Sequence, residues 1–186
     1  MKNEDQELIL ESKKGKMKAF RKLVERYKKP AFFIALGLVG NLEDAYDLSQ
    51  EAFIRVYTNL RNFNPRHRFF NWFYAILTNL CKNHLRDIGV RKRYIKSEVD
   101  AAELNRVGQE SHNPDVLLEK DETSLRLWEE INKLPFEFRE IIVLKHFQGF
   151  SYKEISETLG IPMGTVMSRL YHARKRLKDN LKDVLN

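Results

Sequence analysis

The stretch FSYKEISETLGIPMGTVMSRLYHARKRL, residues 150–177, restricts the fold of this chain more than any other part of it. Ser151 and Glu154 have the spacing of a capping box, which indicates that a helix begins there. Gly160 can supply the left-handed residue that ends this helix after about two turns, and Pro162 suits the first turn of a second helix. Two helices joined by so short a turn predict a helix-turn-helix, whose second helix enters the major groove of DNA.

The second of these helices has one apolar face and one basic face. Val166, Leu170 and Ala173 recur at helical spacing on the apolar side. A cationic helix face is more often merely solvated, whereas a membrane-surface helix carries bulkier apolar residues. Because the capping box, the glycine turn and the short first helix coincide here, we favour a DNA-reading helix. The side chains expected to reach bases or phosphates are Thr165, Ser168, Arg169, His172, Arg174, Lys175 and Arg176.

The rest of the chain also shows helical periodicity, with apolar residues three and four apart and almost no strand signal. Asn41 is typical of an N-cap, with Asp44 three residues later. Pro65 predicts a loop before the next helical segment, 69–87. These patterns predict an all-α fold.

Between the two helical parts the apolar periodicity is lost and the charge changes from basic to acidic, which predicts a flexible linker. A short helical piece is expected within it at 99–104. The predicted organisation is an N-terminal helical domain over 1–88, a linker over 89–113, and a C-terminal four-helix domain over 114–186.

Composition limits the classes of function. A formal net charge of +7 favours an anionic partner. The only cysteine, Cys81, cannot form an intrachain disulfide, which favours a reducing cytoplasm. Five histidines are scattered without the spacing of zinc ligands, and no apolar run is long enough to cross a bilayer. We therefore expect a cytoplasmic protein with no metal, no cofactor and no membrane insertion.

One face of the 69–87 segment combines Trp72 with amide and basic side chains. An exposed aromatic ring, an amide and cations are what single-stranded nucleic acid requires of a protein surface. The alternative, that Trp72 is simply a core residue, has about equal weight. The face comprises Trp72, Asn79, Lys82, Asn83 and Arg86, and the preceding loop adds Phe63, Asn64, Arg66 and Arg68.

The segment EDAYDLSQEAFIRVY, residues 43–57, places an acidic and amide face on a basic protein. The face consists of Asp44, Asp47, Gln50 and Glu51. Such a face would repel DNA, so it indicates a protein partner. An ordinary solvated helix face is an equally weighted interpretation.

In combination these segments resemble the bacterial RNA polymerase sigma factors of the small extracytoplasmic-function (ECF) type. Residues 43–57 look like the family's core-polymerase-binding motif, and FFNWFYAILTNLCKNHLRD, 69–87, looks like its −10-element segment. Residues 134–177 look like its −35-reading domain. The resemblance covers nearly the whole chain apart from the linker.

The resemblance implies a protein that docks on core RNA polymerase, holds promoter DNA at the −35 and −10 elements, and has an anti-sigma factor as a further partner. It assigns core-polymerase contacts to Asp44, Asp47, Gln50 and Glu51. It assigns −10 contacts to Phe63, Asn64, Arg66, Arg68, Trp72, Asn79, Lys82, Asn83 and Arg86. It assigns −35 contacts to Lys145, Tyr152, Thr165, Met167, Ser168, Arg169, Tyr171, His172, Arg174 and Arg176. The chain departs from the family pattern at Met167 and His172, where many members carry Lys or Arg, and at Asn83, where Asp is common.

The expected function is therefore that of a promoter-specificity subunit. No paired carboxylates, nucleophile–base pair or phosphate-cradling glycine loop is visible in the sequence, so we expect neither an enzyme nor a small-molecule substrate. The alternative is a free-standing helix-turn-helix repressor or activator whose N-terminal helices dimerise or sense a ligand. Core polymerase distinguishes the two, because a repressor binds duplex DNA alone.

Overall fold

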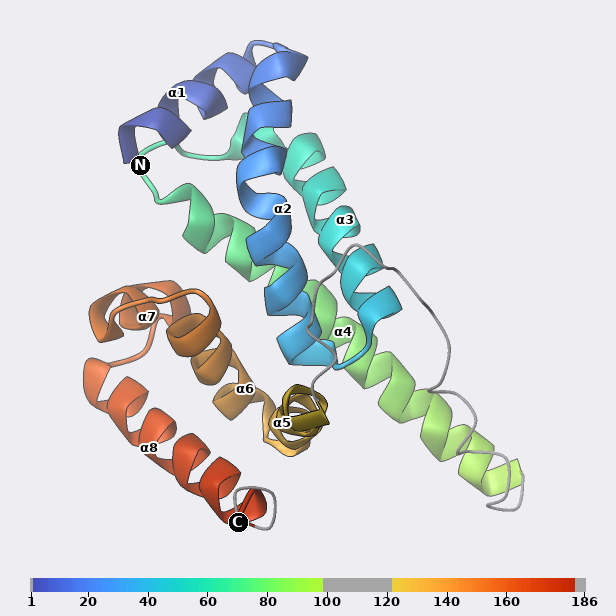
Figure 1. The fold of residues 1–186 in the computed structure, drawn as a ribbon. Coiled ribbons are helices and arrows are strands. Elements are labelled where there is room, and N and C mark those ends of the chain that lie inside the picture. The colour runs from blue at the N-terminus through green and yellow to red at the C-terminus, as the bar shows by residue number, and fades with distance from the viewer. Residues whose placement is uncertain (1, 99–121, 183–186) are drawn as a thin grey trace.

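The computed structural model describes residues 2–98 and 122–182, and every regular element in these ranges is helical, which confirms the predicted all-α class (Figure 1). The short elements η1 and η2 are a 3-10 turn and a π-helical turn. In chain order the elements are α1 (Lys2–Lys13), α2 (Met17–Val39), α3 (Leu42–Asn59), η1 (Leu60–Asn62), α4 (Phe69–Glu98), α5 (Glu122–Lys133), α6 (Phe136–Ile142), η2 (Val143–Phe147), α7 (Tyr152–Leu159) and α8 (Met163–Asn180).

Helices α2, α3 and α4 form the N-terminal bundle, and α1 lies across one end of it (Figure 1). The bundle core contains the fully buried side chains of Leu23, Ile34, Val56 and Phe73. Each such side chain stabilises the fold by roughly 1.5–3 kcal/mol relative to exposure. Asn41 caps α3 as predicted, because its side chain accepts a hydrogen bond of 3.0 Å from the backbone N–H of Asp44.

Helices α5 to α8 form the C-terminal unit, as expected for a four-helix domain, and Ile141, Leu144 and Leu170 are fully buried within it. Its helix-turn-helix has the predicted local chemistry. The Ser151 hydroxyl accepts from the N–H of Glu154 at 3.3 Å, and the Glu154 carboxylate accepts from the N–H of Ser151 at 3.0 Å. Gly160, with φ of +66°, ends α7 in the left-handed conformation.

The two helical units share one continuous apolar core. Gly37 of α2 makes this contact possible, because a Cβ at this position would overlap the side chain of Val143 and touch Trp128. On the other side of the contact the rings of Phe70 and Phe150 lie 4.9 Å apart. The predicted units are thus present and packed against each other. Most of the predicted linker, including 99–104, lies outside the described residues.

Two helices differ from the sequence expectation. The chain from 2 to 13 forms α1, which was not predicted because only Leu8 and Ile9 pack against the core. Helix α4 continues past Ile88 to Glu98, so the first part of the predicted linker, 89–98, is helical. Loss of apolar periodicity does not by itself end a helix, because the basic residues of this stretch are adequate helix formers.

A π-helical turn, η2, follows α6 directly. The backbone N–H of Gln148 donates to the carbonyl of Val143 at 3.1 Å, which is the i to i+5 pattern of such a turn. Its first residues, Val143 and Leu144, are buried against α2 and the C-terminal core. Tertiary packing therefore determines this turn, and the apolar pattern does not reveal it.

Candidate nucleic-acid interface

A hollow with a volume of about 370 Å³ lies between α3, η1 and α4. Its walls are Arg55, Asn59, Asn62, Trp72, Ile76 and Asn79. The α4 residues in this set are spaced by four and three positions, so they lie on one face of the helix. Arg55 and Asn59 are spaced by four on α3. The hollow is within the size range of small-ligand sites and combines an aromatic ring, three amides and one cation.

Trp72 is partly buried, with one side supported by other rings and with atoms lining the hollow. Its ring lies 4.7 Å from that of Phe63 and 6.0 Å from that of Phe69. The two alternatives for Trp72, a core residue and a surface residue, are therefore combined in one side chain. These contacts hold the ring in place at the edge of the hollow.

The polar wall contributed by α3 was missed in the sequence. Arg55 is held by Glu51, whose carboxylate accepts from its Nε at 2.8 Å. The Asn59 amide donates to the carbonyl of Arg55 at 2.9 Å. In the sequence, the i, i+4 spacing of Arg55 and Asn59 places both on one side of α3. The sequence does not tell that this side faces α4, because that depends on how the helices pack.

The loop between η1 and α4 is only partly available to a ligand. Phe63 is 4% exposed, and its ring packs against those of Trp72 and Phe69, so its direct contact with DNA stays a prediction. Asn64 and Arg66 are exposed, and the Asn64 side chain accepts from the N–H of Arg66 at 3.0 Å.

Two basic residues predicted for the same surface lie instead against the C-terminal unit. The guanidinium of Arg68 lies 3.5 Å from Glu154 and 3.2 Å from Glu157 of α7. The ammonium of Lys82 lies 3.7 Å from Glu140 and 4.9 Å from the ring centre of Phe136. Asn79, Asn83 and Arg86 are exposed. The predicted face of α4 is thus divided: Trp72 and Asn79 line the hollow, while Lys82 faces α6.

A buried carboxylate lies in the contact between α4 and α6. Glu140 is 6% exposed and accepts a long hydrogen bond, 3.5 Å, from the hydroxyl of Tyr74. Burial raises the pKa of Glu140 above its usual value of 4.5, and the positive charges of Lys82 and Arg169 oppose this shift. Burial also raises the pKa of Tyr74, and the negative charge of Glu140 raises it further.

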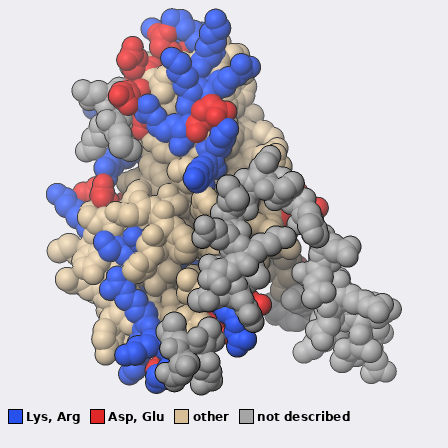
Figure 2. Space-filling model, in the orientation of Figure 1, with Lys and Arg blue, Asp and Glu red and all other residues tan. Residues whose placement is uncertain are grey.

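Helix α8 presents a mixed surface to solvent. Met167 is 51% exposed and Tyr171 is 64% exposed, and Ser168 and His172 are also exposed. Thr165 and Arg169 are partly buried. Helix α8 lies at the lower left of Figure 1, and in Figure 2 Lys and Arg side chains run along this part of the surface.

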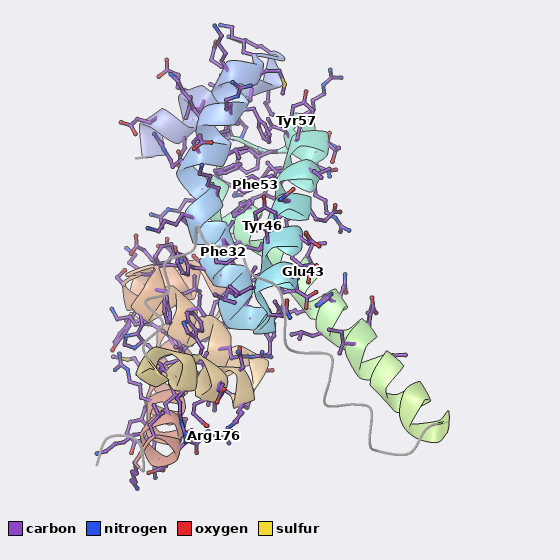
Figure 3. All side chains as sticks on the ribbon, turned by 45° about the vertical axis from the view of Figure 1, so that its right-hand side comes forward. Phe32, Glu43, Tyr46, Phe53, Tyr57 and Arg176 are labelled. Carbon is purple, nitrogen blue, oxygen red and sulfur yellow. The ribbon has the colours of Figure 1, made fainter. Side chains whose placement is uncertain are left out.

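Four other side chains predicted for the −35 surface have partners inside the C-terminal unit. Arg174 bonds the His146 ring at 3.3 Å, and Arg176 lies over the ring of Phe138, 5.2 Å from its centre (labelled in Figure 3). Burial lowers the pKa of His146, and the neighbouring positive charges of Arg174 and Lys145 lower it further. The ammonium of Lys145 donates to the carbonyl of Phe150 at 3.1 Å and lies 5.2 Å from the centre of the Tyr152 ring.

The acidic face of α3 has free and paired members. Asp47 and Gln50 are exposed, Glu51 is paired with Arg55, and Asp44 lies 3.1 Å from Nε2 of His84. Beside this face is an apolar row that was not predicted. Figure 3 shows Tyr57, Phe53 and Tyr46 along α3, with Phe32 of α2 beside them. Tyr46 is 50% exposed, Tyr57 47% and the nearby Ile54 58%.

Within the described ranges, no group of three or more His, Cys, Asp or Glu side chains could hold a metal ion. Among the same residues, no helix is both long enough and apolar enough to traverse a bilayer.

Comparison with known proteins assigns both helical units. Residues 23–91 match the family Sigma-70 region 2, and residues 124–177 match Sigma-70, region 4. The ECF RNA polymerase sigma factor SigW of Bacillus subtilis (strain 168) is 34% identical over 183 residues, covering 95% of this chain and 96% of that protein. The ECF RNA polymerase sigma-E factor of Escherichia coli (strain K12) is 33% identical over 186 residues, covering 97% and 96%.

Solved structures share the fold. CnrH in complex with the cytosolic domain of CnrY superposes with a TM-score of 0.68 at 22% identity, covering 97% of this chain and 98% of that one. RpoE from Bartonella quintana, in complex with the anti-sigma factor NepR, gives 0.69 at 24% identity and covers 89% and 98%. The chain therefore belongs to the ECF RNA polymerase sigma factors, and its function is to direct core RNA polymerase to promoters.

Proposed function

We propose that this sigma factor reads promoter DNA with two surfaces: the hollow between α3 and α4 holds an unpaired base of the −10 element, and the exposed side of α8 reads the −35 duplex. The observation that carries the first assignment is the wall of the hollow, where the ring of Trp72 adjoins the amides of Asn59 and Asn79. Base–aromatic stacking contributes roughly 1–3 kcal/mol per base. The amides supply the donors and acceptors that a base edge requires.

The assignment of the −35 surface rests on the exposure of α8. Met167, Ser168, Tyr171 and His172 are exposed side chains on the second helix of a helix-turn-helix. Arg174 and Arg176 serve phosphates, since each is exposed although it also contacts a ring of its own unit. Lys145 and Tyr152, which contact each other, act mainly by holding the start of α7.

Core polymerase docks, in this proposal, on the outer side of α3. The exposed Asp47 and Gln50 provide its polar part, and Tyr46 and Ile54 provide an apolar part. A mixed surface of this kind fits a stable protein interface better than charges alone, because aromatic residues are enriched where partners bind tightly. The polymerase carries out the chemistry, so the sigma factor itself is not an enzyme.

The same reasoning extends to an inhibitor and to location. CnrH and RpoE are the sigma factors of complexes with the cytosolic domain of CnrY and the anti-sigma factor NepR, respectively. By analogy this chain has an anti-sigma factor as a partner, and it acts in the cytoplasm, where core polymerase is found. The DNA-contacting parts correspond to the domains 1–88 and 114–186, with α4 extending beyond the first.

The test is Asn79→Ala, which removes a wall of the hollow, with Thr58→Ala as a matched control. Thr58 is exposed on α3 and does not line the hollow. Its hydroxyl donates to the carbonyl of Arg55 at 3.1 Å and accepts from the amide of Asn59 at 3.2 Å. The Asn59 amide also donates to the carbonyl of Arg55 at 2.9 Å, so it keeps a partner when the Thr58 hydroxyl is removed. Both variants are combined with core polymerase, and run-off transcription is measured on a promoter selected from a genomic library. We expect Asn79→Ala to lower the fraction of open complexes and Thr58→Ala to leave it unchanged. Equal activities for the two variants would contradict the assignment of the hollow.

A further inference from the structure

Helix α1 donates two side-chain hydrogen bonds to the loop at residues 63–68. The ammonium of Lys13 donates to the carbonyl oxygen of Phe63 at 2.7 Å. The amide of Gln6 donates to the carbonyl oxygen of Pro65 at 3.2 Å. The first bond is partly buried and has a charged donor, so it is of the stronger class. Neither side chain lines the hollow.

Helix α1 is itself fixed to the bundle, so it can serve as an anchor. Ile9 is 1% exposed and belongs to the core. The carboxylate of Asp5 accepts hydrogen bonds of 2.5 Å from Arg26 and from the hydroxyl of Tyr27, both on α2. The positions of Lys13 and Gln6 are therefore set by the packing of α1 on α2.

The loop has few bonds of its own. Within it, Asn64 accepts from the N–H groups of Arg66 and His67, each at 3.0 Å. The loop begins at Phe63, and the ring of this residue supports Trp72 at 4.7 Å. A change in the backbone at Phe63 would therefore move the ring that holds Trp72 at the edge of the hollow.

We infer that α1 is a positioning element for the hollow: Lys13 and Gln6 hold the loop so that Phe63 keeps Trp72 in the orientation that accepts an unpaired base. This inference rests on the proposed function of the hollow. It assigns a role to α1, which lies outside the match to Sigma-70 region 2, because that match starts at residue 23.

The experiment compares Lys13→Met with Lys14→Met in the full chain. Both changes remove one positive charge at neighbouring positions, but Lys14 is exposed and pairs with Glu11 rather than with the loop. The probe is a fluorescein-labelled pool of random-sequence single-stranded DNA dodecamers. We expect Lys13→Met to raise the Kd about threefold to tenfold above that of Lys14→Met, because one hydrogen bond to the loop is lost.

A second readout does not depend on DNA. In a Trp128→Phe background the fluorescence reports Trp72 alone, since the chain has two tryptophans. We expect acrylamide to quench Trp72 more strongly in Lys13→Met than in Lys14→Met. If Lys13→Met does not fold, Gln6→Ala replaces it, because Gln6 is exposed; the expected rise in Kd is then about twofold to threefold.

The outcomes separate this inference from the proposal beneath it. If the wild type and Trp72→Ala bind the pool equally, the hollow does not hold a base, and the quenching comparison alone tests α1. If Trp72→Ala loses binding while Lys13→Met and Lys14→Met agree in both Kd and quenching, the hollow is retained and the positioning role of α1 is overturned.

Discussion

Replacement of Trp72 by alanine should reduce folding stability and promoter opening by separable amounts. The change removes ring contacts at 4.7 Å and 6.0 Å, each of which contributes about 0.5–1.5 kcal/mol. For comparison, replacement of a fully buried Trp by Ala lowers the free energy of unfolding by about 3–5 kcal/mol. Because Trp72 is only partly buried, we expect the free energy of unfolding to fall by about 2–3 kcal/mol.

The effect on DNA is additional to this loss of stability. Stacking of one base on Trp72 contributes roughly 1–3 kcal/mol, so the equilibrium constant for open-complex formation should fall about fivefold to more than a hundredfold. Trp72→Phe should keep part of both effects, because a smaller ring still packs on Phe63 and still stacks. Permanganate footprinting of the holoenzyme measures opening, and urea unfolding of the free protein measures stability.

Trp128→Ala is the matched control for the destabilisation alone. Trp128 is also partly buried and stacks on Phe147 at 4.6 Å, but it lies in the C-terminal unit away from the hollow. It should lower unfolding stability without reducing permanganate reactivity at the −10 element. The stacking argument is refuted if Trp72→Ala loses the expected free energy of unfolding while its holoenzyme opens promoters as well as that of Trp128→Ala. Trp72 would then only support Phe63.

Three further predictions concern other surfaces. Asp47→Lys combined with Glu51→Lys should weaken binding to core polymerase in a pull-down while the thermal melt stays cooperative; an unchanged core affinity would move the docking surface off the acidic side of α3. His172→Arg should sharpen guanine preference at one −35 base pair by about 1–3 kcal/mol in a selection with randomised duplexes, and an unchanged motif would mean that this side chain does not face the bases. Glu140→Gln should raise the free energy of unfolding at pH 7, because burial raises the pKa of Glu140 and so penalises its charged form. The stability that the protonated carboxyl contributes is fully present below pH 4.5 and is lost as the pH rises through the raised pKa, so the gain should shrink as the pH falls toward 4.5. Urea unfolding at several pH values measures this, and a gain independent of pH would refute this cause.

The features that could be predicted from the sequence are those with local causes. The capping box at Ser151 and Glu154 and the turn at Gly160 depend on residues a few positions apart, and the structure has them as predicted. The buried face of α8 follows from helical spacing, so Leu170 and Ala173 are buried as expected. Local signals of this kind fix where helices begin, where they end and which side faces the core.

The features that could not be predicted depend on which helices meet. Arg55 and Asn59 become a wall of the hollow only because α3 packs beside α4. Lys82 lies one turn from Asn79 in the sequence pattern, yet its ammonium lies 3.7 Å from Glu140 of α6, a contact that depends on how the two units pack. Phe63 looks like an exposed loop aromatic, but α4 folds back so that Phe69 and Trp72 enclose it.

The contact between the two helical units includes one basic side chain that was predicted to bind DNA. Arg68 is the last residue of the loop at 63–68, and α7 carries the two carboxylates that hold it, Glu154 and Glu157. All three side chains are about one-third to one-half exposed, so each ion pair contributes only about 0–1 kcal/mol. The bond of 3.1 Å between Thr158 and Asn71 adds about 0.5–1.5 kcal/mol. Contacts this weak can be exchanged for phosphates, so Arg68 can turn from α7 to DNA by a change of its own side chain, while the apolar contact of Phe70 with Phe150 stays in place.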